Sequence, residues 1–400
     1  MYNILLKLIY LILYLNPNEK YKKWRFAQKQ IFEKFKPNKK KVIWIHCASL
    51  GEYEHIKALI PELQKINPLI NITFFSPSGY HHFQNFDLIQ QKSYLPLDTK
   101  DNMKSFIHIM NPMMVIISKN DVWPNMVTCL KEYNIPSYSI GCKLHSKKTK
   151  NWFVRKYYKK YFSQINHIFC EDEFTYQFMK NEKITGCSTI ENMRINQILI
   201  DREHKFHDNK ILNFIEKKRT IIYGSLEEND YDKIIDFIHS RKDVKHIIVP
   251  HEINSKIIKK IEGCFFSNCV LYSAIEKHKK TQKNVLIVDK FGILKHIYQY
   301  SNIAYVGGGF NNGIHNTLEP VVHGNFVLFG PKYKKFKEAF WLIEKHIGKS
   351  IRNHTELSEE INTFLKKPQS KKNISKKILS FLKAKQQNID TILEIIKTKK

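Results

Sequence analysis

The chain has 400 residues, which is too long for one ordinary core and favours two domains. Its hydrophobic fraction is 42%. Its formal net charge is +29, from 66 Lys and Arg against 37 Asp and Glu, so we expect anionic partners such as nucleic acid, anionic lipid or nucleotide sugars. The seven cysteines include no C-x-x-C pair, which argues against a zinc finger or a disulfide framework and favours a reducing compartment.

The N-terminal segment is the first predicted element. Residues 4–15, ILLKLIYLILYL, are nearly all apolar, but the run is shorter than the roughly 20 residues of a spanning helix and Lys7 interrupts it. It lacks the basic start and the cleavage site of a signal peptide. We expect residues 1–20 to form a membrane-associating helix, aided by the basic stretch 20–41. A helix packed on the protein's own core is the alternative.

Apolar strand-like runs then alternate with amphipathic helical stretches along the chain. In the first half the strands are predicted at 42–46, 72–75, 115–118, 137–140 and 167–170, with helices near 53–66, 99–109, 126–133 and 149–165. In the second half the strands are predicted at 220–224, 246–250, 284–288, 303–306 and 326–329. This alternation predicts two doubly wound α/β domains.

The boundaries follow from composition. The polar stretch 198–218 has no strand signal and is predicted to be a linker. We therefore expect an N-terminal domain over 21–205, a C-terminal domain over 206–370, and a basic tail over 371–400 that forms one or two surface helices.

Two polar groups follow predicted strands of the first half. Ser49, Gly51 and Glu52 follow the strand 42–46, and a carboxylate in the first turn after a buried strand can accept a proton from a hydroxyl. An acid stabilised by the helix dipole is an equal alternative. Asp121 and Trp123 follow the strand 115–118, where the tryptophan could also be a packed indole in a turn.

The stretch 305–331, YVGGGFNNGIHNTLEPVVHGNFVLFGP, is typical of a site for a sugar nucleotide. Gly308 and Gly309 let backbone amides approach an anion, and a helix starting at Asn316 would add its N-terminal amides. Glu319 could accept hydrogen bonds from a ribose diol. A glycine-rich turn between a buried strand and a helix is the alternative. Neither a P-loop nor a dinucleotide fingerprint is present.

Eight blocks in order resemble one family. They are WIHCASLGE (44–52), SPSG (76–79), YLPLD (94–98), DVWPN (121–125), YGSLEE (223–228), IIVPHE (247–252), VDKFGIL (288–294) and VGGGFNNGIHNTLEP (306–320). With these blocks the chain resembles the Kdo transferases, the 3-deoxy-D-manno-octulosonic acid transferases of lipopolysaccharide assembly. The resemblance implies a GT-B glycosyltransferase fold, with two Rossmann-like domains facing a central cleft.

The resemblance also implies partners and a location. It implies CMP-Kdo as the donor, bound by the C-terminal half, and a lipid A precursor of the tetraacyldisaccharide 4'-phosphate type as the acceptor, bound by the N-terminal half. It implies a peripheral or monotopic protein at the cytoplasmic face of the inner membrane. Nucleic acid is not expected, since the lysines are spread along the chain and no RNP-type motif or zinc finger occurs.

The family's site residues carry over by motif. Glu52 would be the catalytic base, and no metal or cofactor is expected. The acceptor would meet Ser49, Gly51, Asp121, Trp123 and Lys143. The donor would meet Ser225, Pro250, His251, Gly292, Gly308, Gly309, Asn316 and Glu319.

Three departures from the family pattern stand out. Pro250 and His251 are followed by Glu where the family commonly has Pro-Arg-His, so an arginine is missing near the donor. The stretch before Trp-Pro-Asn usually holds two glutamates in the family, whereas Asp121 is its one carboxylate here. In the block 191–196, Arg194 is the one residue that matches the family pattern. A GT-B enzyme with another nucleotide sugar, or a non-catalytic basic binder, remains an alternative.

Overall fold

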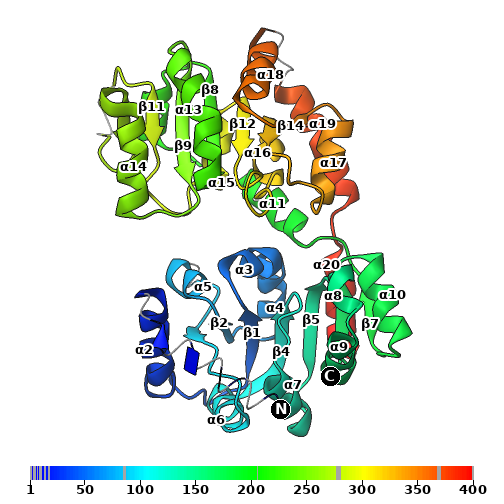
Figure 1. The fold of residues 1–400 in the computed structure, drawn as a ribbon. Helices are drawn as coiled ribbons and strands as arrows, with labels where there is room; N and C mark the ends of the chain where they lie inside the picture. The colour runs from blue at the N-terminus through cyan, green and yellow to red at the C-terminus, as the bar shows by residue number, and fades with distance from the viewer. Residues whose placement is uncertain are drawn as a thin grey trace. The chain divides into compact units, whose positions relative to one another are not determined.

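Two compact units make up the fold of this computed structural model (Figure 1). The structure describes residues 19–83, 87–204, 206–275, 281–366 and 371–398, together with 2, 6, 8, 11, 12, 15 and 16. The first unit comprises Met1–Gln197 and Lys385–Lys400, and the second comprises Ile198–Ala384. Each contains one parallel sheet with helices between its strands, which confirms the predicted pair of doubly wound α/β domains.

The sheet of the first unit has seven parallel strands in the order β3-β2-β1-β4-β5-β6-β7. The strands are β1 (Val42–Cys47), β2 (Ile70–Phe74), β3 (Gln91–Tyr94), β4 (Pro112–Ser118), β5 (Ser137–Cys142), β6 (His167–Cys170) and β7 (Cys187–Thr189). The strand order reverses between β1 and β4. In open α/β sheets, ligands bind beyond the carboxyl ends of the strands at such a reversal.

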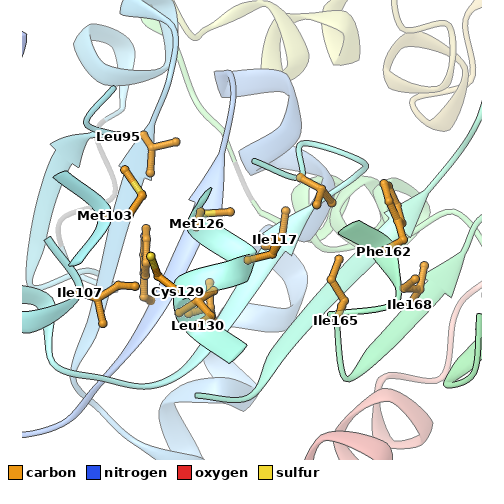
Figure 2. Close-up of a cluster of buried hydrophobic side chains, with 14 of the residues drawn as sticks. Leu95, Met103, Ile107, Ile117, Met126, Cys129, Leu130, Phe162, Ile165 and Ile168 are labelled. Carbon is orange, nitrogen blue, oxygen red and sulfur yellow. The ribbon is translucent and has the colours of Figure 1, made fainter. Parts of the chain in front are cut away.

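Alternate residues of the central strands supply two separate cores, because successive side chains of a strand point to opposite faces. Val42 and Trp44 belong to one core, and Ile43 and Ile45 to the other. Figure 2 shows the first core, to which α6 (Lys100–Met110), α7 (Pro124–Glu132) and α9 (Trp152–Phe162) contribute buried side chains. The second is covered by α3 (Leu50–Ile56), α4 (Ile60–Ile66) and α20 (Ile389–Thr398).

The remaining helices of this unit border the sheet. They are α2 (Glu19–Lys34), η1 (Lys57–Leu59), α5 (Pro77–His82), α8 (Ser146–Thr149) and α10 (Glu173–Asn181), and α11 (Arg194–Glu203) begins here and continues into the second unit.

The sheet of the second unit repeats this order with parallel strands, β10-β11-β9-β8-β12-β13-β14. The strands are β8 (Thr220–Leu226), β9 (Lys245–Pro250), β10 (Cys269–Leu271), β11 (Val285–Ile287), β12 (Ile303–Val306), β13 (Phe326–Phe329) and β14 (Gly348–Ser350). The helices are α12 (Asn209–Ile215), η2 (Glu228–Asp230), α13 (Tyr231–Ser240), α14 (Ser255–Phe265), η3 (Phe266–Asn268), α15 (Leu294–Ile297), η4 (Tyr298–Tyr300), α16 (Leu318–Val322), α17 (Lys337–Glu344), α18 (His354–Lys366) and α19 (Lys371–Ala384). The reversal lies between β8 and β12.

One prediction about a connecting segment is wrong, and another about the tail is incomplete. The stretch 198–218 is no linker, because it folds into the end of α11 and into α12, whose Ile211 and Phe214 are buried in the core of the second unit. The tail forms two helices, α19 and α20, as predicted, but each buries apolar side chains. Figure 1 shows α20, in red, beside β5, and Tyr138 of β5 donates a hydrogen bond to the Ile396 carbonyl at 3.1 Å.

The N-terminal segment is described at a few positions. Residues 2, 6, 8, 11, 12 and 15 are helical, and the rest of 1–15 lies outside the described residues. Leu6 is buried, whereas Leu8, Leu11, Ile12 and Leu15 are 52 to 71% exposed. Among the described helices, none has both the length and the apolar composition needed to cross a membrane.

Candidate active site

Glu52 lies in the first turn of α3, just beyond the end of β1 and thus at the strand-order reversal. Ser49 is extended at the N-cap without a side-chain cap bond, and the Ala48 amide donates instead to Glu52 Oε2. A Cβ added at Gly51 would make an ordinary contact, 3.8 Å from Ser49 Oγ, so local packing does not demand glycine there. The loop therefore holds the half-buried Glu52 carboxylate at a fixed place.

The surroundings of Glu52 make it a stronger base than an ordinary glutamate. Burial raises its pKa above the usual value, and the nearby charge of Asp121 raises it further. The Ala48 amide and His46 act in the opposite direction without cancelling the rise. A carboxylate with a raised pKa accepts a proton more readily, as a general base requires.

A hydrogen-bonded chain connects the ends of β1 and β4. Thr73 Oγ1 accepts from Trp44 Nε1 at 2.8 Å and lies 2.9 Å from His46 Nδ1. His46 Nε2 lies 2.8 Å from Asp121 Oδ2, to which Trp123 Nε1 also donates at 3.2 Å. An ionised carboxylate can only accept, so the proton of His46 is assigned to Nε2. Asp121 is thereby held beside Glu52.

The YLPLD and DVWPN blocks meet through Asp98. Its carboxylate accepts from the amides of Asn125 at 2.9 Å and Met126 at 2.8 Å, in the first turn of α7. Burial raises the pKa of Asp98 to about 6. Trp123 precedes this helix and its indole packs on Phe75, with ring centroids 4.8 Å apart. The tryptophan is therefore both a packed indole and a partner of Asp121.

A second charged group of the first unit surrounds Glu171, which follows β6. Lys119 forms an ion pair with Glu171, and His55 Nε2 lies 3.3 Å from Glu171 Oε2. Burial alone would raise the pKa of Glu171, but His55 and the charge of Lys119 lower it to about 2. The charges of Lys143 and Arg194 act on Lys119, in the direction that lowers its pKa. Three cations, Lys119, Lys143 and Arg194, therefore lie close enough to influence one another around Glu171.

In the second unit, Glu227 lies at the corresponding reversal, directly after β8. His315 Nε2 lies 2.9 Å from Glu227 Oε1, and the His315 ring stacks on His251 with centroids 4.2 Å apart. Burial lowers the pKa of His315, and the neighbouring His251 lowers it further. Asp230 joins this loop to the glycine run, because it accepts from the amides of Glu227 at 2.9 Å and Gly308 at 2.8 Å.

Close packing explains the glycine run after β12. Gly308 has φ +86, and a Cβ there would lie 2.5 Å from the Gly313 carbonyl oxygen and 2.9 Å from His315 Cδ2. A Cβ at Gly309 would lie 2.6 Å from Gly330. The Gly308 amide is bonded to Asp230 in this structure. The glycines are thus needed for packing, which supports the alternative of a tight turn, while a role at a phosphate stays a prediction.

The helix expected from Asn316 begins later and is short. α16 covers Leu318–Val322 alone, so the expectation of helix N-terminal amides at Asn316 is wrong. Asn316 instead accepts from the Leu318 amide at 3.0 Å and donates to Glu319 Oε1 at 2.7 Å. The amide therefore orients the Glu319 carboxylate.

The other predicted donor residues are scattered around this loop. Ser225 has a left-handed φ of 54°, and Pro250 ends β9, whose following residue His251 donates its amide to the Leu226 carbonyl at 2.9 Å. Gly292 lies in an exposed turn before α15, with open space around it. The structure thus brings His251 and Gly308 together, whereas no described contact joins Gly292 to them.

Several residues of these clusters were missed from the sequence as candidates. They are His46, Glu171, Glu227 and Asp230, together with His315 of the glycine-rich stretch 305–331. A polar residue within an otherwise apolar strand, as in VIWIHC, was the available signal for His46.

Comparisons with known proteins show a similarity to Kdo transferases. Residues 23–197 match the family model described as 3-Deoxy-D-manno-octulosonic-acid transferase (kdotransferase). The chain is 27% identical to a 3-deoxy-D-manno-octulosonic acid transferase of Aquifex aeolicus, over 84% of this chain and 91% of that protein. It is 28% identical to a bifunctional glycosyltransferase/methyltransferase of Fusobacterium nucleatum, over 99% of this chain but 63% of that longer protein.

The fold has counterparts among solved structures. The UDP-GlcNAc 2-epimerase from Neisseria meningitidis superimposes with a TM-score of 0.55 at 14% identity, over 90% of this chain and 100% of that one. This likeness supports the fold alone, and with the two parallel sheets it confirms the predicted GT-B class of two Rossmann-like domains. The resemblance to the Kdo transferase family is likewise confirmed, by the family model over residues 23–197 and by relatives over most of the chain.

Proposed function

We propose that the protein is an inverting glycosyltransferase that moves Kdo from CMP-Kdo to a lipid A precursor of the tetraacyldisaccharide 4'-phosphate type. The family assignment supports the transferred sugar. The observation that carries the proposal is Glu52, a carboxylate of raised pKa fixed at the strand-order reversal of the first unit.

The proposed reaction needs one base. Glu52 takes the proton of the acceptor's primary hydroxyl as its oxygen attacks the anomeric carbon of Kdo, and CMP leaves from the opposite face. The new bond therefore has inverted configuration. A positioned base of this kind contributes about 10²–10⁴-fold to the rate. Asp121 keeps the pKa of Glu52 raised, and His46 keeps Asp121 in place. The proton transfer to Glu52 itself needs no metal.

The acceptor is assigned to the first unit on its charge. Lys119, Lys143 and Arg194 act together on the cluster around Glu171 and His55, which leaves an excess of positive charge. A phosphorylated disaccharide would be attracted there. Trp123 and Asp121, whose side chains meet at 3.2 Å, would contact the sugar beside Glu52.

The donor is assigned to the second unit. The loops after β8, β9 and β12 meet around Glu227, His251 and His315, and Asn316 orients Glu319 toward a role at the ribose hydroxyls. The arginine of the family's Pro-Arg-His is absent, so another group must counter the charge of the donor's phosphate. A different nucleotide sugar is therefore the second candidate.

We also propose that the protein associates peripherally with the cytoplasmic face of the inner membrane. Leu8, Leu11, Ile12 and Leu15 expose more than half of their surface, and the neighbouring stretch 20–41 is basic. Recovery of the full-length protein entirely in the soluble fraction at low salt would contradict this.

The test is transfer by the purified chain, with CMP-Kdo generated in the assay and a lipid A precursor in detergent. Mass spectrometry should show a gain of one or more Kdo units together with release of CMP. A donor panel read by CMP, UDP and GDP release separates the two candidates. Release of UDP or GDP with no CMP would refute the proposed donor.

A further inference from the structure

We propose that Glu227, His251 and His315 bind a divalent transition-metal ion such as Zn²⁺. The three side chains each offer one ligand atom, and these atoms lie within 4.8 Å of one another. Two imidazoles and one carboxylate form a donor set that zinc uses where it keeps a coordination position open. No metal was expected from the sequence, since its cysteines form no C-x-x-C pair and the family resemblance implies none. Glu227, His251 and His315 are far apart in the chain, so no local motif indicates them.

The backbone holds each of the three residues in place. The Glu227 amide donates to Asp230 Oδ2 at 2.9 Å, and the His251 amide to the Leu226 carbonyl at 2.9 Å. The His315 amide donates to the Gly307 carbonyl at 3.1 Å. These bonds join the loops that follow β8, β9 and β12. The ligands are therefore gathered by the fold and need little ordering on binding.

The proposed site also has a hydrogen-bond partner for one ligand and a solvent-exposed ligand through which an ion can enter. Asn311 Nδ2 donates to Glu227 Oε2, which leaves Oε1 directed at His315 Nε2, 2.9 Å away. Such outer partners orient metal ligands and raise affinity. The His251 side chain is exposed, and its ring stacks on that of His315 at 16°. Binding requires the exposed His251 ring to turn so that both imidazoles face the ion.

The ion would replace a missing charge. Zn²⁺ with one carboxylate and two neutral imidazoles has a net charge of 2 − 1 = +1, equal to that of an arginine guanidinium. His251 follows Pro250, where the family commonly has arginine. The open coordination position would then take a phosphate oxygen of the nucleotide. This role rests on the proposed function, whereas the metal site itself does not.

The first measurement is calorimetric titration of the metal-stripped full chain, without a histidine tag, with Zn²⁺. We expect one equivalent to bind. Loss of an outer partner of a metal ligand typically lowers metal affinity by about 10–100-fold. His251→Ala removes a ligand and should weaken Zn²⁺ binding by more than this, whereas Asn311→Ala removes an outer partner and should weaken it by about 10-fold. His354→Ala, at an exposed histidine of the same unit, is the matched control and should change nothing.

A second probe guards against misfolding. Co²⁺ in place of Zn²⁺ should give the visible absorption of a low-coordinate site, which His251→Ala should abolish while the thermal unfolding curve stays unchanged, since the side chain is exposed. Binding that is absent in the wild type, or equal in the His251→Ala and His354→Ala variants, would overturn the metal site and leave Glu227 and His315 as a structural pair.

The role at the phosphate is tested separately with CMP. CMP should bind the Zn²⁺-loaded chain at least about 10-fold more tightly than the stripped chain, and His251→Ala should remove this difference. Equal CMP affinity with and without Zn²⁺ would refute the phosphate role while leaving the metal site standing. Failure of Kdo transfer with both forms, despite CMP binding, would instead contradict the proposed function.

Discussion

The two units share a strand order, and each places a carboxylate after the strand at which that order reverses. In the first unit, Glu52 has another carboxylate, Asp121, nearby, and its pKa is raised. In the second, Glu227 faces His315, which stacks on His251. One arrangement favours taking up a proton, and the other favours holding a charged ligand. The same topology therefore supports two chemistries, which the neighbouring side chains determine.

The largest expected effect comes from replacing Glu52, which tests the proton-accepting arrangement of the first unit. Glu52→Gln keeps the shape of the side chain but removes the proposed base, so kcat should fall about 10²–10⁴-fold. Glu54→Gln is the matched control, since Glu54 lies on the same helix and pairs with the partly buried Lys57. Steady-state kinetics of CMP release measure both. Equal kcat values for the two variants would remove Glu52 as the base.

The next effect tests the buried charges of the first unit. Lys119→Met leaves Glu171, 9% exposed, without its cation, and should lower the free energy of unfolding by about 3 kcal/mol. Lys100→Met breaks the solvent-exposed pair with Glu132, which water screens, and should lower the free energy of unfolding far less. Urea unfolding followed by tryptophan fluorescence compares them, and equal losses would argue against a buried network.

The stability lost in Lys119→Met should depend on pH in one direction. The pKa of Glu171 is lowered from 4.5 to about 2, so its stabilisation is present above pH 4.5 and disappears as the pH falls through 2. The difference between wild type and Lys119→Met should therefore shrink between pH 4.5 and 2. A difference that grows on acidification would contradict the assignment.

A smaller effect concerns the glycine run of the second unit. Gly308→Ala places a Cβ at φ +86 and 2.5 Å from the Gly313 carbonyl oxygen, which should cost about 1–3 kcal/mol and weaken CMP binding. Gly263→Ala, in α14 where the added methyl meets open space, should be neutral or stabilise by up to about 1 kcal/mol. Thermal unfolding of both variants checks this contrast. Similar unfolding temperatures would mean that the loop adapts.

The smallest effect is a displacement of the pH–rate profile. If Glu52 is the base, as we propose, it must be deprotonated, so kcat/KM should rise with pH through its raised pKa. Asp121→Asn removes the charge that raises this pKa, so the rising limb should move to lower pH. An unchanged limb would mean that another group sets it.

The sequence predicted the interior of each sheet but not its edges. Strands β6, β12 and β13 were predicted at their observed bounds, because each is a continuous apolar run. The strands absent from the prediction are β3, β7, β10 and β14, which are the edges of the two sheets. They are three or four residues long, and QKSY of β3 and GKS of β14 carry no alternating apolar pattern. Their pairing is set by the neighbouring strand.

The site was predictable where a motif keeps its residues together. Glu52, Asp121 and Asn316 were found within their blocks, whereas the partners that set their chemistry come from other strands. His46 meets Asp121 across 75 positions, and Glu227 meets His315 across 88. Such pairs follow from strand order and register, which local patterns do not encode.

We propose that the first unit provides the base and the second binds the donor. The most direct test measures donor affinity and turnover together in Glu52→Gln and His251→Ala. Calorimetry with CMP gives the affinity, and mass-resolved Kdo transfer gives the turnover. We expect Glu52→Gln to lose turnover and keep CMP affinity, and His251→Ala to lose CMP affinity. Weakened CMP binding in Glu52→Gln together with unchanged binding in His251→Ala would contradict this proposal.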